Sequence, residues 1–333
     1  MSHYLFYPGC SMTRSARPYL DSFMAIRDEL GIDVEEVRDW NCCGATEYAA
    51  VHGAAAYALV GRNLALAEKQ VDGTRTLLAG CSACYLNLAK TDHMMRENPR
   101  FGARINEALA AGDLHYDPGS VEVRHLLDVI YNEVGLDAIR RRVVRPLQGL
   151  RAAPYYGCMI VRPDPDHRFD SPEYPLELDR LLRVLGVEVV SYPQKTQCCG
   201  GHMTQISPPV AYELIRRLVQ GAEQNQAHII VTLCPMCQLN LDAFQSDMND
   251  HFNTDYHIPV LYFTQLLGLA FGHEPAELGL RREFVSSREA LAYAGVDVPI
   301  EEEEVPAPRR RRRAKDDPSL PMPKMPGDEE ALL

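Results

Sequence analysis

Residues 229–237 carry the sequence IIVTLCPMC, an apolar run followed at once by a Cys-x-x-Cys pair. Residues 76–84, with the sequence TLLAGCSAC, follow the same plan. A short apolar run of this kind is consistent with a buried strand, and we expect each Cys-x-x-Cys pair to stand where the next helix begins. The chain therefore predicts two copies of one strand–cysteine–helix unit, which indicates an internal duplication.

The other cysteines extend this duplication over most of the chain. The spacing is C-x31-C-C-x37-C-x2-C in the first copy and C-x39-C-C-x34-C-x2-C in the second, and these patterns account for all ten cysteines. The first cysteine set is Cys10, Cys42, Cys43, Cys81 and Cys84, and the second cysteine set is Cys158, Cys198, Cys199, Cys234 and Cys237. No spare thiol remains to act as a separate nucleophile, so we assign no further catalytic residue.

Neighbouring positions repeat as well. A tyrosine stands three residues before the first cysteine of each set, a glycine follows each Cys-Cys pair, and an Asn-Leu pair begins three residues after each last cysteine. These positions are Tyr7 and Tyr155, Gly44 and Gly200, Asn87 and Asn240. The tyrosines are equally compatible with ordinary strand residues and the Asn-Leu pairs with ordinary helix packing. Each glycine allows a positive φ or a close backbone approach beside the paired cysteines.

Apolar patterns place each group of cysteines near the end of a predicted strand. We expect strands over residues 4–7, 32–37, 76–79, 155–156, 187–192 and 229–233, and helices over residues 16–30 and 47–69. Strands that alternate with helices predict an α/β fold with a parallel sheet, here formed twice. Because ligands gather at the carboxyl ends of such strands, three loops would bring five sulfur atoms to one place in each half.

Length and composition limit the remaining possibilities. A chain of 333 residues, 46% apolar, corresponds to about two domains, and we expect them to span residues 1–145 and 146–300. Residues 301–333 combine a glutamate run, five consecutive arginines and several prolines, which predicts a disordered charged tail. The net charge of −12 argues against nucleic acid as the main partner. We find no signal peptide and no membrane span, and expect a cytoplasmic protein.

Clustered cysteines in a reducing compartment favour metal binding or redox chemistry over disulfides. A tetrahedral zinc site and a cubane [4Fe–4S] cluster each use four protein ligands, so five thiolates exceed both. Iron–sulfur clusters, zinc sites and redox-active thiols all stay open on spacing alone. The sequence contains neither a GxGxxG fingerprint nor a P-loop, so redox chemistry would require electron exchange with a partner.

The repeated pattern of single cysteine, Cys-Cys-Gly and Cys-x-x-Cys resembles that of the CCG-domain proteins, and most closely the B subunit of heterodisulfide reductase. Supporting matches are YPGC at residues 7–10, YGC at 156–158, CCGG at 198–201, TLCPMC at 232–237 and TQLL at 264–267. This resemblance implies two Rossmann-like halves related by a pseudo-two-fold axis. It also implies that each cysteine set holds a non-cubane [4Fe–4S] cluster, in which a cysteine bridges irons.

The resemblance further implies a function within a complex. Such a protein cleaves a disulfide, or forms one from thiols, between its two clusters, and exchanges electrons with a ferredoxin-like companion subunit, which is itself served by a flavoprotein subunit. The alternative is an electron-transfer component of a flavin-dependent dehydrogenase without disulfide chemistry. A third hypothesis is a zinc-structured scaffold that docks partners through the charged tail.

A few individual residues bear on substrate choice. Met159 follows Cys158 where methanogen-type members of the family often have histidine, which puts the coenzyme M–coenzyme B disulfide in doubt as substrate. Arg162 and Lys195 are either surface charges or contacts for an anionic substrate. His125 is predicted to be structural, because it lies within residues 123–127, a predicted strand end.

Overall fold

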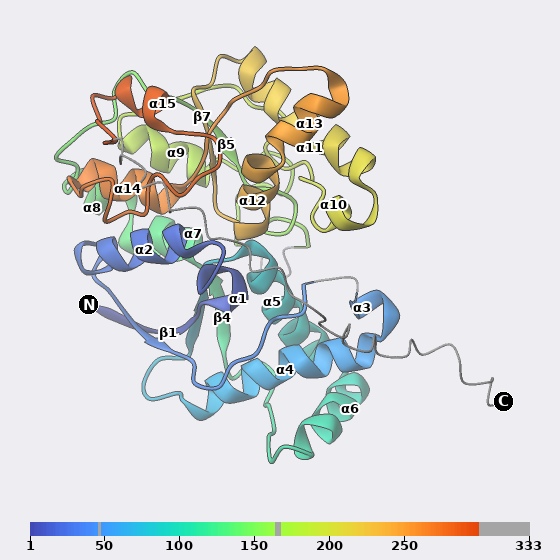
Figure 1. Cartoon of the computed structure of the whole chain (residues 1–333). Helices are drawn as coiled ribbons and strands as arrows, with labels where there is room; N and C mark the ends of the chain where they lie inside the picture. The colour runs from blue at the N-terminus through green and yellow to red at the C-terminus, as the bar shows by residue number, and fades with distance from the viewer. Residues whose placement is uncertain (46–47, 164–167, 300–333) are drawn as a thin grey trace, which may run out of the picture. The chain divides into compact units, whose positions relative to one another are not determined.

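The computed structural model describes residues 1–45, 48–163 and 168–299. Residues 1–298 form one compact unit (Figure 1). The predicted boundary between residues 145 and 146 stays a prediction, and the predicted disordered tail lies outside the described residues. Among the helices of the described part, none has both the length and the apolar character needed to cross a bilayer.

The first half builds a four-stranded sheet in which every neighbouring pair is parallel, in the order β2-β1-β3-β4. Its strands are β1 (Ser2–Tyr7), β2 (Ile32–Glu36), β3 (Thr76–Ala79) and β4 (Glu122–His125). Its helices are α1 (Gly9–Met12), α2 (Arg17–Leu30), α3 (Tyr48–Val51), α4 (Gly53–Lys69), α5 (Ser82–Glu97), α6 (Pro99–Ala110), α7 (Leu126–Val129), the π-helical turn η1 (Ile130–Val134) and α8 (Leu136–Arg140).

The second half repeats this plan in a parallel sheet of order β6-β5-β7-β8. Its strands are β5 (Arg151–Tyr155), β6 (Glu188–Val189), β7 (Ile229–Thr232) and β8 (Val260–Tyr262). Its helices are α9 (Glu177–Val184), α10 (Met203–Ile206), α11 (Pro208–Gln224), α12 (Pro235–Ala243), α13 (Gln245–Phe252), α14 (Phe263–Phe271) and α15 (Arg288–Ala292). The predicted α/β class with two parallel sheets is thus confirmed.

The strand order places a topological switch point in each half. The second strand pairs on one side of the first strand and the third strand pairs on the other, so the loops after strands one and three leave in opposite directions. In open α/β sheets this switch point, at the carboxyl ends of the strands, is the usual ligand site. Cys10 and Cys81 follow β1 and β3, and Cys158 and Cys234 follow β5 and β7.

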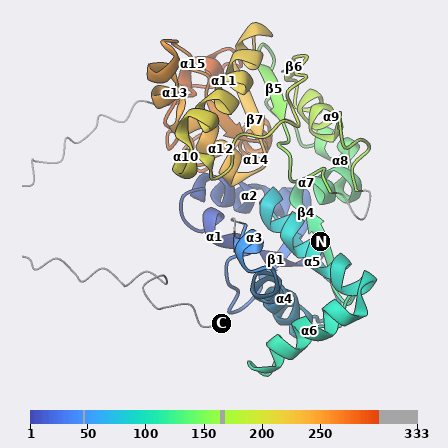
Figure 2. The ribbon, with the colours of Figure 1, turned by 90° about the vertical axis from the view of Figure 1, so that its right-hand side faces the viewer.

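Helix α2 carries the contact between the halves. It buries Tyr19, Phe23, Ile26 and Leu30, one helical face, and ends at Gly31 with a left-handed φ of 69°. It packs beside α14 from the other half, as both views show (Figures 1 and 2). The apolar residues of both halves accordingly belong to one continuous core.

Three predicted elements differ clearly from those observed. The strand expected over residues 155–156 is only the end of β5, which begins at Arg151 and excludes Tyr156. The helix expected over residues 47–69 is interrupted at His52, whose backbone leaves the helical region and whose ring Nδ1 accepts the N–H of Ala55 to start α4. Val51, within the helix expected over residues 47–69, is 81% exposed. The strand expected over residues 187–192 is limited to Glu188–Val189, since only two residues of β6 pair with β5.

Candidate metal centre at the switch points

The first cysteine set comes together at the carboxyl end of the first sheet. Cys10 lies in α1 and Cys42 in the loop after β2, and their sulfur atoms are 3.4 Å apart. Cys43 and Cys84 bring their sulfur atoms to 3.3 Å of each other, and Cys81 is the N-cap of α5. Cys10 and Cys42 are exposed, whereas the other three are buried. The predicted convergence of three loops is therefore observed here.

The second cysteine set has the same arrangement. The sulfur atoms of Cys199 and Cys237 are 3.5 Å apart, and the thiols of Cys158 and Cys198 are hydrogen-bonded to each other. Cys234 is the N-cap of α12, as Cys81 is of α5. All ten cysteines of the chain are free thiols, and Cys198 is the exposed member of this set.

The two sets adjoin across the contact between the halves. The thiols of Cys81 and Cys234 share a hydrogen bond. Beside them the ring of Tyr19 stacks on that of Tyr262, with centroids 4.4 Å apart and planes 10° from parallel. Ser22 and Thr264 are hydrogen-bonded at 2.7 Å in the same contact. Sequence reasoning assigned no role to this tyrosine pair, because a long-range contact leaves no local pattern in the sequence.

A glycine precedes the single cysteine of each set for a steric reason. Gly9 and Gly157 adopt φ values of 69° and 70°. A Cβ atom at Gly9 would lie 2.8 Å from the sulfur of Cys84, and one at Gly157 would lie 3.0 Å from that of Cys237. Glycine tolerates both the left-handed backbone and the close approach. Each glycine therefore leaves the space that the sulfur atoms of its set occupy.

The repeated tyrosines hold the Cys-Cys loops. The hydroxyl of Tyr7 donates to the carbonyl of Asn41 at 2.6 Å, and that of Tyr155 donates to the carbonyl of Gln197 at 2.7 Å. Both acceptors directly precede a Cys-Cys pair. Burial raises the pKa of both phenols, so they stay protonated donors. These tyrosines are strand residues, and they also position the loops.

The repeated asparagines hold the same loops from the following helices, α5 and α12. The side-chain amide of Asn87 donates to the carbonyl of Cys43 at 2.9 Å. That of Asn240 donates to the carbonyl of Gly201 at 2.7 Å and to that of Cys199 at 3.3 Å. The glycines after the Cys-Cys pairs, Gly44 and Gly200, have the positive φ that the sequence led us to expect, 64° and 97°.

Hydrogen bonds among the thiols favour the ionised form of three cysteines. Bonds from Cys42 and Cys84 lower the pKa of Cys43 well below that of an ordinary thiol. The pKa of Cys198 is lowered by bonds from Cys158 and Cys199, and that of Cys234 by bonds from Cys237 and Cys81. Thiolates are the form that binds soft metals. Hydrogen bonding between the thiols also raises the pKa of the partner cysteines, so the first set favours one thiolate and the second set two, among protonated thiols; these partners are Cys81, Cys84, Cys158, Cys199 and Cys237.

The chemistry of the donors fits an iron–sulfur group. Within the described residues, no three His, Cys, Asp or Glu side chains surround one point as ligands of a single ion. Instead the thiols touch in pairs at each switch point, and glycines keep Cβ atoms away from the buried sulfurs. Five soft sulfur donors per set suit a multi-iron cluster better than one tetrahedral zinc ion.

Other residues considered from the sequence lie apart from this chemistry. His125 ends β4 and is fully buried, and its Nδ1 accepts the N–H of Leu127, which fits the structural role predicted for it. Arg162 donates to the carbonyl of Thr196 and to the carboxylate of Glu173. Lys195 has no exposed surface, so neither reading of it, as a surface charge or as a contact for an anionic substrate, fits its position.

Comparison with known proteins agrees with this duplicated site. The model of the cysteine-rich domain family CCG matches residues 4–89 and 152–242. The chain is 33% identical over 284 residues to the 8-methylmenaquinol:fumarate reductase membrane anchor subunit of Wolinella succinogenes, covering 85% of this chain and 97% of that protein. It is 32% identical over 266 residues to the B subunit of the ferredoxin:CoB-CoM heterodisulfide reductase of Methanosarcina mazei, covering 79% of this chain and 87% of the relative.

A solved structure shares the fold. A hypothetical protein from Helicobacter pylori superimposes with a TM-score of 0.66 at 13% identity, covering 85% of this chain and 52% of that one. The chain thus spans about half the length of that protein. Both cysteine sets lie within the residues matched by the family model. The chain belongs to the CCG cysteine-rich domain family and is related to the B subunits of heterodisulfide reductases.

Proposed function

We propose that this chain is the catalytic iron–sulfur subunit of a heterodisulfide-reductase-like complex. In this proposal each cysteine set binds one non-cubane [4Fe–4S] cluster. The observation that carries the proposal is the contact of two complete sets: Cys81 of the first and Cys234 of the second are hydrogen-bonded across the halves. Two redox centres at one interface suit a substrate with two sulfur atoms, because each half serves one of them.

The net reaction is the reduction of a disulfide by two electrons and two protons to two thiols, or its reverse. Bound clusters would supply or accept the electrons one at a time. The chain's own residues would hold the site: Tyr7 and Tyr155 fix the Cys-Cys loops, and Gly9 and Gly157 leave room beside the buried sulfurs. A substrate would enter past the exposed thiols, which are Cys10, Cys42 and Cys198.

The complex would include a ferredoxin-like subunit and a flavoprotein subunit in the cytoplasm. The described part of the chain carries no helical span of its own, and the relatives from Methanosarcina are named as components of ferredoxin-dependent enzymes. A second candidate is an electron-transfer component of a flavin-dependent dehydrogenase. It is favoured by the 33% identical relative, whose name is that of a menaquinol:fumarate reductase component.

Metal analysis after anaerobic purification tests the cofactor. We expect about eight iron atoms and about eight acid-labile sulfides per chain, as two four-iron clusters require. Cys84→Ser and Cys237→Ser disable one set each, so either variant should retain about half of the iron. Zinc at about one per half without iron would contradict the proposal and favour the scaffold hypothesis.

Turnover then separates the two redox functions. The chain loaded with iron is reduced with an artificial donor and offered an organic disulfide, and released thiols are counted. If the unaltered chain releases thiols, and both Cys84→Ser and Cys237→Ser abolish this release, the result supports disulfide chemistry that needs both cysteine sets. Full reduction and reoxidation of the clusters without thiol release would favour the electron-transfer function. Addition of a thiol under oxidising conditions should produce a new paramagnetic signal only in the first case.

A further inference from the structure

Lys195, in the loop before Cys198, and Asp179, in α9, form a buried ion pair. The ammonium of Lys195 lies 2.7 Å from a carboxylate oxygen of Asp179 and donates to the carbonyl of Pro175 at 3.0 Å. It also lies over the ring of Tyr174, 4.1 Å from the centroid. The Lys195 side chain has no exposed surface and that of Asp179 is 4% exposed. The ammonium is therefore enclosed by protein on every side.

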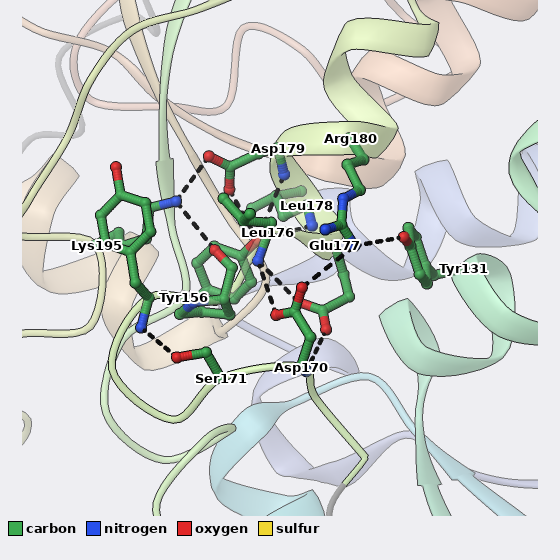
Figure 3. Close-up of polar contacts among 12 residues, drawn as sticks. Tyr131, Tyr156, Asp170, Ser171, Leu176, Glu177, Leu178, Asp179, Arg180 and Lys195 are labelled. Carbon is green, nitrogen blue, oxygen red and sulfur yellow. Dashed lines mark hydrogen bonds and ion pairs between the residues drawn. The ribbon is translucent and has the colours of Figure 1, made fainter.

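Tyr156 completes this network. Its hydroxyl donates to the second carboxylate oxygen of Asp179 at 2.9 Å and accepts the N–H of Leu178 at 2.8 Å. Figure 3 shows Lys195, Tyr156 and Asp179 directed toward one another from separate segments of the chain. Both oxygens of the Asp179 carboxylate thus have a partner, and α9 is tied to the segment that follows β5.

The same lysine also joins two cysteine loops through its backbone. The carbonyl of Lys195 accepts the N–H of Tyr156 at 2.9 Å and the N–H of Gly157 at 3.1 Å. Gly157 directly precedes Cys158 and faces the sulfur of Cys237, whereas Lys195 stands three residues before Cys198. The side-chain and backbone bonds therefore close a ring through Lys195, Asp179 and Tyr156, next to the loops that carry Cys158 and Cys198.

This ring has no equivalent among the described residues of the first half. The residue three positions before Cys42 is Asp39, whose side chain is 78% exposed and pairs with Arg62 at the surface. The residue two positions before Cys10 is Pro8, which has neither a hydroxyl nor a backbone N–H to donate. The two cysteine sets have equivalent thiols, tyrosines and asparagines. They differ because a buried ion pair joins the loops of the second set and none joins the equivalent described positions of the first.

Burial of this ion pair adds little to the free energy of folding. Desolvation of two charges offsets most of their attraction, and well-packed apolar residues would be about as stable. The ion pair fixes the relative orientation of the two segments that it joins. Its short hydrogen bond requires one geometry, whereas apolar contacts would tolerate small shifts. Groups behind a metal site that orient its ligands typically change metal affinity about 10–100-fold when they are lost.

We propose that Lys195 is a positioning residue of the second cysteine set, which with Asp179 and Tyr156 holds the Cys158 loop against the Cys198 loop. This inference rests on the proposed function, since it concerns how that set holds its cluster. It assigns the two clusters different environments: a buried ion pair joins the loops of the second set, and the corresponding positions of the first set, Pro8 and Asp39, form no such pair.

Lys195→Met tests the proposal, because methionine fills a similar volume without charge. We expect iron loss to a chelator in two phases, one of them about tenfold faster than in the unaltered protein. The other phase and one of the two paramagnetic signals should stay unchanged. Repeating the substitution in a Cys84→Ser chain, which keeps only the second set, should retain the fast phase. Lys69→Met, an exposed lysine bonded to the Asp113 carbonyl, is the control and should change neither phase.

Tyr156→Phe keeps the experiment decisive if Lys195→Met fails to fold. It removes the bond to Asp179 and leaves the ion pair, so the same phase should accelerate by a smaller factor. Unchanged iron loss in Tyr156→Phe, or equal acceleration of both phases in either variant, would overturn the inference. Iron missing from the unaltered chain would instead contradict the proposed function, so the two failures are distinguishable.

Discussion

Tyr19 of the first half stacks on Tyr262 of the second, and each ring lies beside the hydrogen-bonded thiols of Cys81 and Cys234. Both tyrosines are buried, at 0% and 2% exposure. The pair thus joins the halves at the point where the two cysteine sets adjoin. Movement of one half against the other would separate the rings and the thiols together, which couples the packing of the halves to the geometry of the site.

Replacing Tyr19 by alanine should destabilise the whole compact unit. Removal of a buried aromatic ring typically costs about 3–5 kcal/mol, since a cavity remains. We expect this decrease in the free energy of unfolding, measured by urea denaturation in anaerobic buffer. Phe284→Ala is the control, because Phe284 is 74% exposed, and should change the value by less than about 0.5 kcal/mol. Equal effects of the two substitutions would refute the importance of the contact.

Gly157→Ala should impair the second cysteine set through a steric clash. The new Cβ would lie 3.0 Å from the sulfur of Cys237, in addition to the strain of a left-handed backbone. Gly295→Ala is a matched control, with a φ of 69° and nothing within 4 Å of its Cβ. Both variants should lose about 1 kcal/mol or more of stability from backbone strain. Only Gly157→Ala should lose iron, about half of the total, as measured by metal analysis.

Tyr155→Phe should loosen the loop that carries Cys198 and Cys199. It removes the 2.7 Å hydrogen bond to the carbonyl of Gln197, and loss of such a bond costs about 0.5–1.5 kcal/mol. Amide hydrogen exchange of this loop should accelerate. Tyr192→Phe removes a comparable bond, to the carbonyl of Leu218 at 2.9 Å, and should leave exchange in the cysteine loop as it is.

Asp242 should make stability depend on pH between about 4 and 6. Burial raises the pKa of this carboxyl from 3.8 to about 6, against hydrogen bonds from the N–H groups of Val285 and Phe284. The folded state then binds more protons than the unfolded state in this range, so its stability falls as pH rises. The loss should reach on the order of 3 kcal/mol by pH 7.

Asp242→Asn isolates this contribution. The difference in free energy of unfolding between the unaltered protein and the variant should change in favour of the variant as pH rises from 4 to 7. The change of this difference with pH reports the pKa of Asp242. Its absolute value does not, because the substitution also alters two backbone hydrogen bonds by an amount that does not depend on pH. A constant difference across this range would contradict the raised pKa.

Local patterns were enough to predict much of the site. The spacing of the ten cysteines revealed the duplication, and the apolar runs before Cys81 and Cys234 placed strands there correctly, because a buried strand must be apolar along its length. The repeat also singled out Tyr7, Tyr155, Asn87 and Asn240, although only their hydrogen bonds distinguish a positioning role from ordinary packing.

The sequence failed where burial depends on distant segments. A lysine near a cysteine loop suggests a surface charge, because charged side chains are usually exposed. Lys195 is buried since Asp179 and Tyr156, distant from it in the sequence, supply its partners. The break at His52 was missed for a related reason, because apolar periodicity continues through it and only its backbone shows the interruption.

The sequence by itself determined the fold class, the duplication and the ten thiols, since these follow from short-range spacing and from periodicities that a strand or helix imposes on its neighbours. Only the tertiary structure decided that β1 lies beside β3 and β5 beside β7, and that Cys81 meets Cys234. Strand order and the docking of the halves arise from burial of apolar faces against partners far along the chain, which spacing does not record.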